Sequence, residues 1–420
     1  MIRSYFWRKI LARTGFASFF PSIRKDLGGA DDYLRYYSDR TLAMPVDELI
    51  DPCLLPEANT PDVINLALGA PRCEIPLGRV NDFRASSPWG NLALRTRLTE
   101  QHQLDYGIEH DPNDEMLITH GASGAFAATL DAFVNPGDAV VLFDPTSPIF
   151  PIGLQHRRAQ IRWLSTWSDG GRVRFAMDAF AKNMRGAKLL VMADPVNPTG
   201  CVFAPEDIEQ IAFWARKHDV LIFHDASFDR WRDGPARARL TSLPHAHGRI
   251  VTCGSFAKSH GLSSIRVGWL TGHRHLVRPC TAAMLLTAPF VSTACQRIAL
   301  EALQSREAIM NSLRDEVIGR RDYVRESLQE LGLEPWDAAG GFFFWAKTPG
   351  AEPGREFAQR LLRDTGVLIN PGSPFSPAGE SFVRISYITD EGRLREGLDR
   401  LRRFVMREPS PGMPVAQLIP

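Results

Sequence analysis

SFAKSHGLSSIRVGW, residues Ser255 to Trp269, holds a single lysine, Lys258, among small hydroxylated neighbours, with one arginine eight residues further on. The stretch follows an apolar run, Arg249–Cys253, that is typical of a short buried strand. Apolar walls and a second cation both lower the pKa of a lysine at a strand end, which favours nucleophilic amine chemistry. Taken alone, the stretch also fits an exposed lysine in a loop of serine and glycine. The surrounding sequence decides between these interpretations.

Short apolar runs alternate with helical patterns from about residue 95 onward. We expect strands at Ala139–Phe143, Lys188–Met192, Val220–Phe223 and Ile250–Cys253, and helices at Leu92–Gln103, Gly121–Phe133 and Pro205–His218. Continuous apolar strands separated by helices are typical of a sheet that is buried on both faces and is therefore largely parallel. The pattern predicts an α/β fold, with a large domain whose mostly parallel sheet is sandwiched by helices.

A smaller α/β C-terminal domain is predicted after residue 298. Its expected elements are a long charged helix from Ala299 to about Leu331, a strand at Gly341–Ala346, a helix at Gly354–Asp364, strands at Val367–Ile369 and Phe382–Ser386, and a helix from about Glu391 to Met406. The predicted division is an N-terminal arm with a small-domain segment at 1–60, the large domain at 61–298, the small domain at 299–407 and a flexible tail at 408–420.

Polar side chains follow four of the expected strands: Ser147, Asn197, Asp225 and Lys258. Ligands of open α/β sheets bind beyond the carboxyl ends of the strands. Because these four residues all follow strand ends, we expect them to meet at one edge of the sheet. Their convergence favours a functional lysine over an exposed one.

The composition narrows the class of protein. The chain of 420 residues is 44% hydrophobic and 23% charged, as in ordinary globular proteins. A net charge of +1 gives no electrostatic basis for nucleic-acid binding. Six scattered cysteines without a CxxC pair favour reduced thiols in a cytoplasmic protein over disulfides or a zinc site. We expect no membrane span, since no run approaches the ~18 apolar residues required.

The first 25 residues mix unopposed basic residues with aromatic ones. We expect an arm that packs on its own subunit or on a partner subunit. Contact with a membrane surface and organelle targeting are the alternatives.

Residues 255–269 resemble the cofactor-lysine signature of fold-type-I, pyridoxal-phosphate-dependent aminotransferases of class I and II. Further segments that resemble this family are, in chain order, Ile64–Pro71, Asn197–Gly200, Gly366–Gly372 and Phe382–Tyr387. The resemblance covers roughly residues 62 to 400. It implies a pyridoxal 5'-phosphate cofactor and a homodimer whose active sites use both subunits.

The resemblance assigns groups to the cofactor ring. Lys258 would form the Schiff base, and Asp225 would pair with the pyridine nitrogen. Asn197 would donate a hydrogen bond to the phenolic oxygen of the ring. Phe228 stands where the family has a tyrosine that binds the same oxygen, and it cannot donate.

A second set of residues is expected to hold the cofactor phosphate. Gly121, Ala122 and Ser123 open a predicted helix, and a helix N-terminus presents free N–H groups to a phosphate. Ser255 and Arg266 match family positions that also hold the phosphate. An arginine can do so with two parallel hydrogen bonds.

Arg384 is the candidate for binding the substrate's α-carboxylate. It lies inside the apolar strand Phe382–Ser386, where an arginine is costly unless it is paired. A salt bridge to an internal acid is the alternative. The resemblance also places Gly69 and Asn197 beside the substrate.

Several positions depart from the family pattern. Ser147 stands where an aromatic side chain usually stacks on the cofactor, and Phe150 is the candidate to replace it. Ser86 stands about where relatives place a tyrosine from the neighbouring subunit, and Ser292-Thr293 where some reach the partner's phosphate. Ala288–Phe290 contains no arginine for a second carboxylate, which disfavours aspartate or glutamate as the substrate.

The predicted function is that of a pyridoxal-phosphate-dependent aminotransferase that moves an amino group between an amino acid and a 2-oxo acid. A pyridoxal-phosphate lyase or cyclase on the same fold, acting on an amino acid, is the alternative, because the cofactor site alone hardly separates the two. A degenerate homologue that serves as a binding module is a third class. Its fused DNA-reading extension is not matched by the roughly 60-residue arm.

Overall fold

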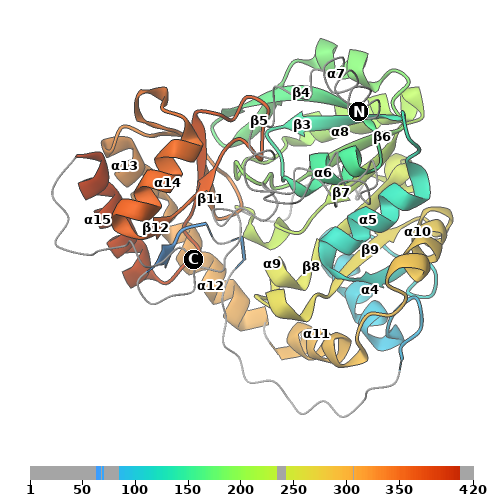
Figure 1. Cartoon of the computed structure of the whole chain (residues 1–420). Coiled ribbons are helices and arrows are strands. Elements are labelled where there is room, and N and C mark those ends of the chain that lie inside the picture. The colour runs from blue at the N-terminus through green and yellow to red at the C-terminus, as the bar shows by residue number, and fades with distance from the viewer. Residues whose placement is uncertain (1–62, 68, 71–84, 234–242, 306, 407–420) are drawn as a thin grey trace, which may run out of the picture.

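The computed structural model describes residues 63–67, 69–70, 85–233, 243–305 and 307–406. The predicted arm at 1–60 and tail at 408–420 lie outside the described residues. In Figure 1 a large unit built on one sheet stands beside a smaller unit that contains the C-terminal strands and helices.

The large sheet has eight strands in the order β2-β9-β8-β7-β6-β3-β4-β5. They are β2 (Met116–Thr119), β3 (Ala139–Asp144), β4 (Gln160–Asp169), β5 (Arg172–Phe175), β6 (Leu189–Ala193), β7 (Leu221–Asp225), β8 (Ile250–Ser255) and β9 (Gly268–Gly272). Pairing is parallel from β4 through β3, β6 and β7 to β8. β9 runs antiparallel to both of its neighbours, and β5 runs antiparallel to β4. The prediction of a mostly parallel sheet is confirmed.

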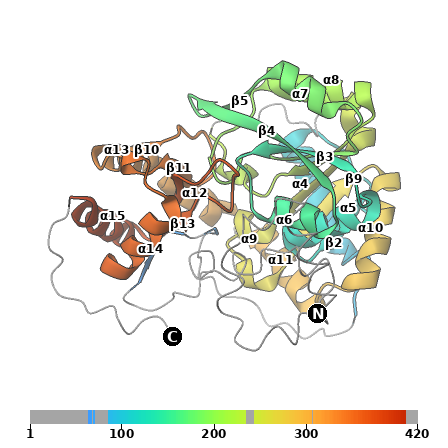
Figure 2. The same cartoon turned by 45° about the horizontal axis from the view of Figure 1, so that its top comes forward.

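Helices cover both faces of this sheet, as Figure 2 shows. On one face, Val141, Leu190 and Ile222 pack in a core with α7 (Met177–Met184) and α8 (Pro205–His218). The opposite core contains side chains of the same three strands together with α5 (Gly121–Phe133), α6 (Ile149–His156) and α10 (Arg274–Thr287). Burial on both faces is the reason these strands are continuously apolar.

Local sequence signals place the helix ends. α8 begins with Pro205, which is tolerated there because the first N–H groups have no intrahelical partner, and its last turn is basic. α4 (Leu92–Tyr106) begins where the side chain of Asn91 accepts a hydrogen bond from the N–H of Leu94. It ends at Gly107, whose φ of 67° suits glycine.

The small unit contains two short sheets and the last helices. One sheet has the order β10-β11-β14-β13, from β10 (Glu334–Pro335), β11 (Phe343–Lys347), β13 (Asn370–Pro371) and β14 (Phe382–Ser386). In the other, β1 (Ile64–Asn65) pairs parallel with β12 (Val367–Leu368). Helices α14 (Gly354–Thr365) and α15 (Glu391–Val405) complete its core. The first described strand therefore lies with the C-terminal ones.

Two parts differ from the sequence expectation. The long helix expected from Ala299 to about Leu331 is interrupted at Arg320, between α12 (Glu307–Gly319) and α13 (Arg321–Glu330). α11 (Thr293–Ser305) precedes α12, and residue 306 lies outside the described residues. No proline marks this interruption, and the charged pattern continues across it. The β4–β5 hairpin was not expected, because most of β4 is only partly buried and has no continuous apolar run. No helix within the described ranges is both long and apolar enough to cross a membrane.

Candidate active site

A cavity of about 350 Å³ lies at the carboxyl ends of β6, β7 and β8. All of the predicted site residues except Gly121 line it: Gly69, Ala122, Ser123, Asn197, Asp225, Phe228, Ser255, Lys258, Arg266 and Arg384. The structure therefore brings together groups that lie more than 300 residues apart in the chain.

Lys258 lies on α9 (Phe256–Ser259), the short helix that directly follows β8. Burial, followed by the charges of Arg384 and Arg266, lowers the pKa of its amine to about 8, although Asp225 acts in the opposite direction. A Cβ atom built on Gly69 would lie 3.8 Å from Lys258 Nζ, so the glycine leaves room above the amine. The amine of Lys258 is therefore neutral in a large fraction of molecules near pH 8.

Asp225 ends β7 and faces the cavity. Its Oδ1 accepts a hydrogen bond from the N–H of Ser227 at 2.9 Å and lies 3.6 Å from the thiol sulfur of Cys253, its register partner on β8. Burial raises the pKa of the carboxyl, whereas hydrogen bonds and Lys258 lower it. A buried carboxylate of this kind favours a cationic ligand that can share its charge.

The N-terminus of α5 faces Arg266. Gly121 has a φ of +70°, and a Cβ atom there would lie only 2.8 Å from Nη2 of Arg266. Gly268 lies close to the same helix N-terminus, since a Cβ atom built on it would lie 2.6 Å from the backbone of Gly121. Glycine at 121 lets the guanidinium approach the helix N-terminus, and glycine at 268 lets β9 pack directly against that N-terminus. Ser255, which caps α9, lines the same cavity. The donors here suit a phosphate.

Arg384 on β14 is buried between two aromatic rings. Its Cζ lies 4.4 Å from the ring centroid of Phe343 and 4.9 Å from that of Phe375. Burial lowers the pKa of the guanidinium to about 9. The cation–π contacts offset part of the cost of burying this cation.

The hydrogen bonds of Arg384 go to neutral oxygens. Nη1 donates to Oδ1 of Asn197 at 2.8 Å, and Nη2 donates to Oδ1 of Asn370 at 2.5 Å and to the carbonyl of Ala67 at 3.0 Å. Its Nε has no partner. Among the described residues no carboxylate pairs with it, so the alternative of an internal salt bridge finds no support there. Because Asn197 gives its amide oxygen to Arg384, its NH₂ group is the part that can donate to a ligand.

Phe228 contributes a wall to the cavity. Its ring packs edge-to-face against Phe342 and Phe343, and Lys258 Nζ lies 5.9 Å from its centroid. Phe150 also lines the cavity, but its ring packs against Phe126 at 4.9 Å and only 1% of the residue is exposed. The ring of Phe150 therefore packs mainly in the hydrophobic core of the large unit.

Sequence reasoning missed Asn370, Phe375 and Cys253. Each contacts a predicted site residue only because distant elements meet in space. Asn370 lies in Gly366–Gly372, a segment that the family resemblance includes, which was the one signal available.

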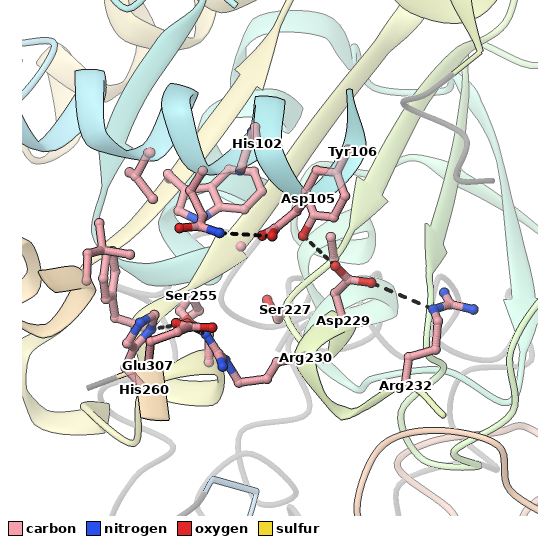
Figure 3. Close-up of a pocket in the computed structure, with 18 of the residues that line it drawn as sticks. His102, Asp105, Tyr106, Ser227, Asp229, Arg230, Arg232, Ser255, His260 and Glu307 are labelled. Atoms are coloured by element: carbon pink, nitrogen blue, oxygen red, sulfur yellow. Dashed lines mark hydrogen bonds and ion pairs between the residues drawn. The ribbon is translucent and has the colours of Figure 1, made fainter. Parts of the chain in front are cut away.

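A second cavity of about 260 Å³, shown in Figure 3, adjoins the first, because Ser227 and Ser255 line both. A buried polar chain runs along it. The hydroxyl of Tyr106 donates to Asp229 at 2.6 Å, Arg232 lies 3.7 Å from Asp229, and Arg232 forms a 2.5 Å ion pair with Asp194. The chain connects α4 to the loops that follow β6 and β7.

The comparisons with known proteins agree with this geometry. The model of the family "Aminotransferase class I and II" matches residues 58–401. The chain belongs to that family. Its members use pyridoxal phosphate, so this chain is an aminotransferase with that cofactor.

Relatives of this aminotransferase differ in the substrates that their names state. It is 27% identical to the aspartate aminotransferase of Pyrococcus abyssi, over 84% of this chain and 93% of the relative. It is 26% identical to the LL-diaminopimelate aminotransferase of Oleidesulfovibrio alaskensis, over 81% and 91%. The solved aromatic aminotransferase of Pyrococcus horikoshii is 26% identical, with a TM-score of 0.76 over 83% of this chain and 97% of that one. The names of these relatives therefore do not identify the amino donor of this chain.

The chemical groups that line the cavity suit pyridoxal phosphate. It offers a lysine with a lowered pKa for the aldehyde, a buried carboxylate for the pyridine nitrogen, and a helix N-terminus with an arginine for the phosphate. Arg384 remains with an unpartnered Nε for a substrate carboxylate.

The lowered pKa of Lys258 predicts the pH dependence of its reactivity. Only the neutral amine is nucleophilic, so labelling of Lys258 in apoprotein by a small aldehyde and a reductant should rise about tenfold per pH unit below the pKa of about 8 and then level off. Mass spectrometry of the labelled peptide measures the rate. Arg384→Gln removes a cation and should move the midpoint upward. A plateau reached only above about pH 10, as for an ordinary lysine, contradicts the lowered pKa.

The buried pair of Arg232 and Asp194 predicts a large effect on stability. Arg232→Met should lower the free energy of unfolding by about 3–5 kcal/mol, because it leaves Asp194 buried without its partner. Arg363→Met, at an arginine whose side chain is 63% exposed, is the control and should change little. Adding Asp194→Asn to Arg232→Met should recover part of the loss. Equal unfolding midpoints for the two single variants in urea would show that the pair contributes nothing.

Proposed function

We propose that this aminotransferase transfers the amino group of an amino acid to a 2-oxo acid with Lys258, Asp225 and Arg384 as its central residues. The observation that carries the proposal is a buried arginine with no carboxylate partner among the described residues, in one cavity with a lysine of lowered pKa. A ligand carboxylate would complete the arginine's hydrogen bonds.

Pyridoxal phosphate, when bound, supplies an electron sink for the negative charge that develops at the substrate's α-carbon. Asp225 would keep a proton on the pyridine nitrogen, because a buried carboxylate is stabilised by a cation beside it. Arg266, Ser255 and the first N–H groups of α5, at Gly121 to Ser123, would hold the phosphate.

Lys258 would act as the base that takes and returns the proton at the α-carbon. A pKa of about 8 keeps a useful fraction of its amine neutral near neutral pH. Arg384 would fix the substrate by its carboxylate, and Asn197 would orient both the guanidinium and the ring. Phe343 and Phe375 cover the faces of the guanidinium and keep water from them, which strengthens its attraction for the carboxylate.

Variants of Lys258 and Arg384 test these roles. Lys258→Ala should remove cofactor trapping by borohydride and all activity. Arg384→Ala should lower kcat/KM about a hundredfold for amino acids, a loss of roughly 3 kcal/mol, but much less for amines that lack a carboxylate. Equal losses for both kinds of substrate would refute the carboxylate role. Formation of pyridoxamine phosphate with release of the 2-oxo acid distinguishes transamination from a lyase or cyclase reaction.

We also propose a cytoplasmic homodimer. The described cysteines Cys201, Cys253, Cys280 and Cys295 are free thiols, in keeping with a reducing compartment. Large apolar side chains are exposed at Leu92, Leu285, Leu286 and Phe290. The hydroxyl of Ser86 donates to the carbonyl of Val291. The segment that leads into α4 therefore lies beside the segment that follows α10. An exposed apolar patch of this kind is typical of a protein interface.

Charge introduced into this patch should dissociate the dimer. Leu286→Glu combined with Phe290→Glu should give a monomer at micromolar concentration, because two carboxylates would be buried without partners. Leu104→Glu is the control, since Leu104 is 75% exposed at the other end of α4 and Leu286 is 89% exposed. Light scattering measures the mass. A wild-type protein that is monomeric and fully active at the same concentration would refute the proposal.

A further inference from the structure

The charged groups of the first cavity are few. Among the described residues that line it, four carry a formal charge: Asp225, Lys258, Arg266 and Arg384. Under the proposed function each has its partner already. Asp225 serves the pyridine nitrogen, Lys258 the aldehyde, Arg266 the phosphate and Arg384 the α-carboxylate. No cation or anion of the described lining remains to bind a charged group on the substrate's side chain.

The other residues of the lining are uncharged: Asn197 and Asn370, which already bind Arg384, serines that include Ser147, and a wall of apolar residues. Pro374 and Phe375 come from the small unit, and Pro148, Ile149 and Ile152 come from α6 and the turn before it. A carboxylate bound at Arg384 brings the adjoining carbon atoms close to Phe375, whose ring centroid lies 4.9 Å from the guanidinium carbon.

One hydrogen bond joins the two halves of this wall. The N–H of Thr146, in the turn before α6, donates to the carbonyl of Phe375 at 2.9 Å. Phe375 therefore lies beside the turn that contains Ser147 and Pro148 and leads into Ile149, which lines the cavity and is 41% exposed. A substrate side chain that leaves the α-carbon on this side meets mainly hydrocarbon, with Ser147 as the one polar side chain among these described residues.

We propose, on the basis of the proposed function, that the amino donor is a monocarboxylic amino acid with an apolar or aromatic side chain, selected by Phe375 and Ile149. Burial of an apolar side chain against this wall stabilises its complex. A second carboxylate or an ammonium group would lose its hydration against the wall and find no opposite charge there. Aspartate, glutamate and diaminopimelate are therefore poor donors for this chain.

Single-turnover reactions of the cofactor-loaded protein test the preference. L-phenylalanine, L-leucine and L-methionine should convert the cofactor at least tenfold faster, at equal subsaturating concentration, than L-aspartate, L-glutamate or LL-diaminopimelate. Absorbance of the cofactor follows the reaction. If the charged donors are as fast or faster, the preference is refuted while the proposed function stands. If no amino acid converts the cofactor, the proposed function itself fails.

A binding measurement tests the wall without any reaction. 3-Phenylpropionate and succinate both carry a carboxylate for Arg384, but only succinate carries a second one. Calorimetry on the cofactor-loaded protein should show 3-phenylpropionate bound at least tenfold more tightly. Tighter binding of succinate would overturn the proposal even if the protein turns over no amino acid.

A matched pair of variants assigns the selectivity to the wall. Ile149→Arg adds a cation to the cavity lining and should raise the ratio of L-glutamate to L-leucine rates at least tenfold. Phe213→Arg, at a residue of α8 that is 43% exposed and outside the cavity lining, adds the same charge elsewhere and should leave the ratio unchanged. An equal change in both variants would mean that the overall charge, and not the wall, sets the preference, which contradicts the proposal.

Discussion

The burial of one arginine without a carboxylate partner among the described residues is the constraint on which this site depends. Arg384 holds Asn197 of the large unit, Asn370 of the small unit and the carbonyl of Ala67 with a single guanidinium. Neutral oxygens and two aromatic faces make its burial tolerable without neutralising it. The cation is thus kept ready for an anion, and the three segments that hold it surround the place where that anion would bind.

The same charge acts on the lysine. Arg384 and Arg266 both lower the pKa of Lys258, in addition to the effect of burial, while Asp225 opposes them. The protein therefore obtains a partly neutral amine from the groups that bind the two anions of cofactor and substrate. When those anions bind, the cations are neutralised and the pKa of the amine should rise, since its neighbours no longer repel a proton. Ligand binding and the basicity of Lys258 are coupled in this way.

Contacts outside the cavity hold the backbone of Lys258 in position. The indole N–H of Trp231 donates to the carbonyl of Lys258 at 3.0 Å, so the segment after Asp225 holds the lysine's backbone. That segment is tied in turn to α12, through the ion pair of Arg230 with Glu307 and the hydrogen bond from Arg314 to the carbonyl of Arg232. Because α12 lies between α11 of the large unit and α13 of the small one, the lysine, the carboxylate and the connection between the units form one continuous structure.

The sequence by itself determined the central parallel strands of the large sheet, most helices and the identity of the charged residues. Lys258, Asp225 and Arg384 could be found because each stands at or in a short apolar strand, and such a pattern depends only on neighbours along the chain. The β4–β5 hairpin and the break between α12 and α13 could not, because a partly buried strand and a proline-free helix boundary leave no comparable local pattern. The tertiary structure alone decided that Asn370 and Phe375 serve Arg384, that Cys253 lies beside Asp225, and that Arg232 pairs with Asp194. Those contacts join different elements, and their energies come from burial and charge in three dimensions, which no local pattern contains.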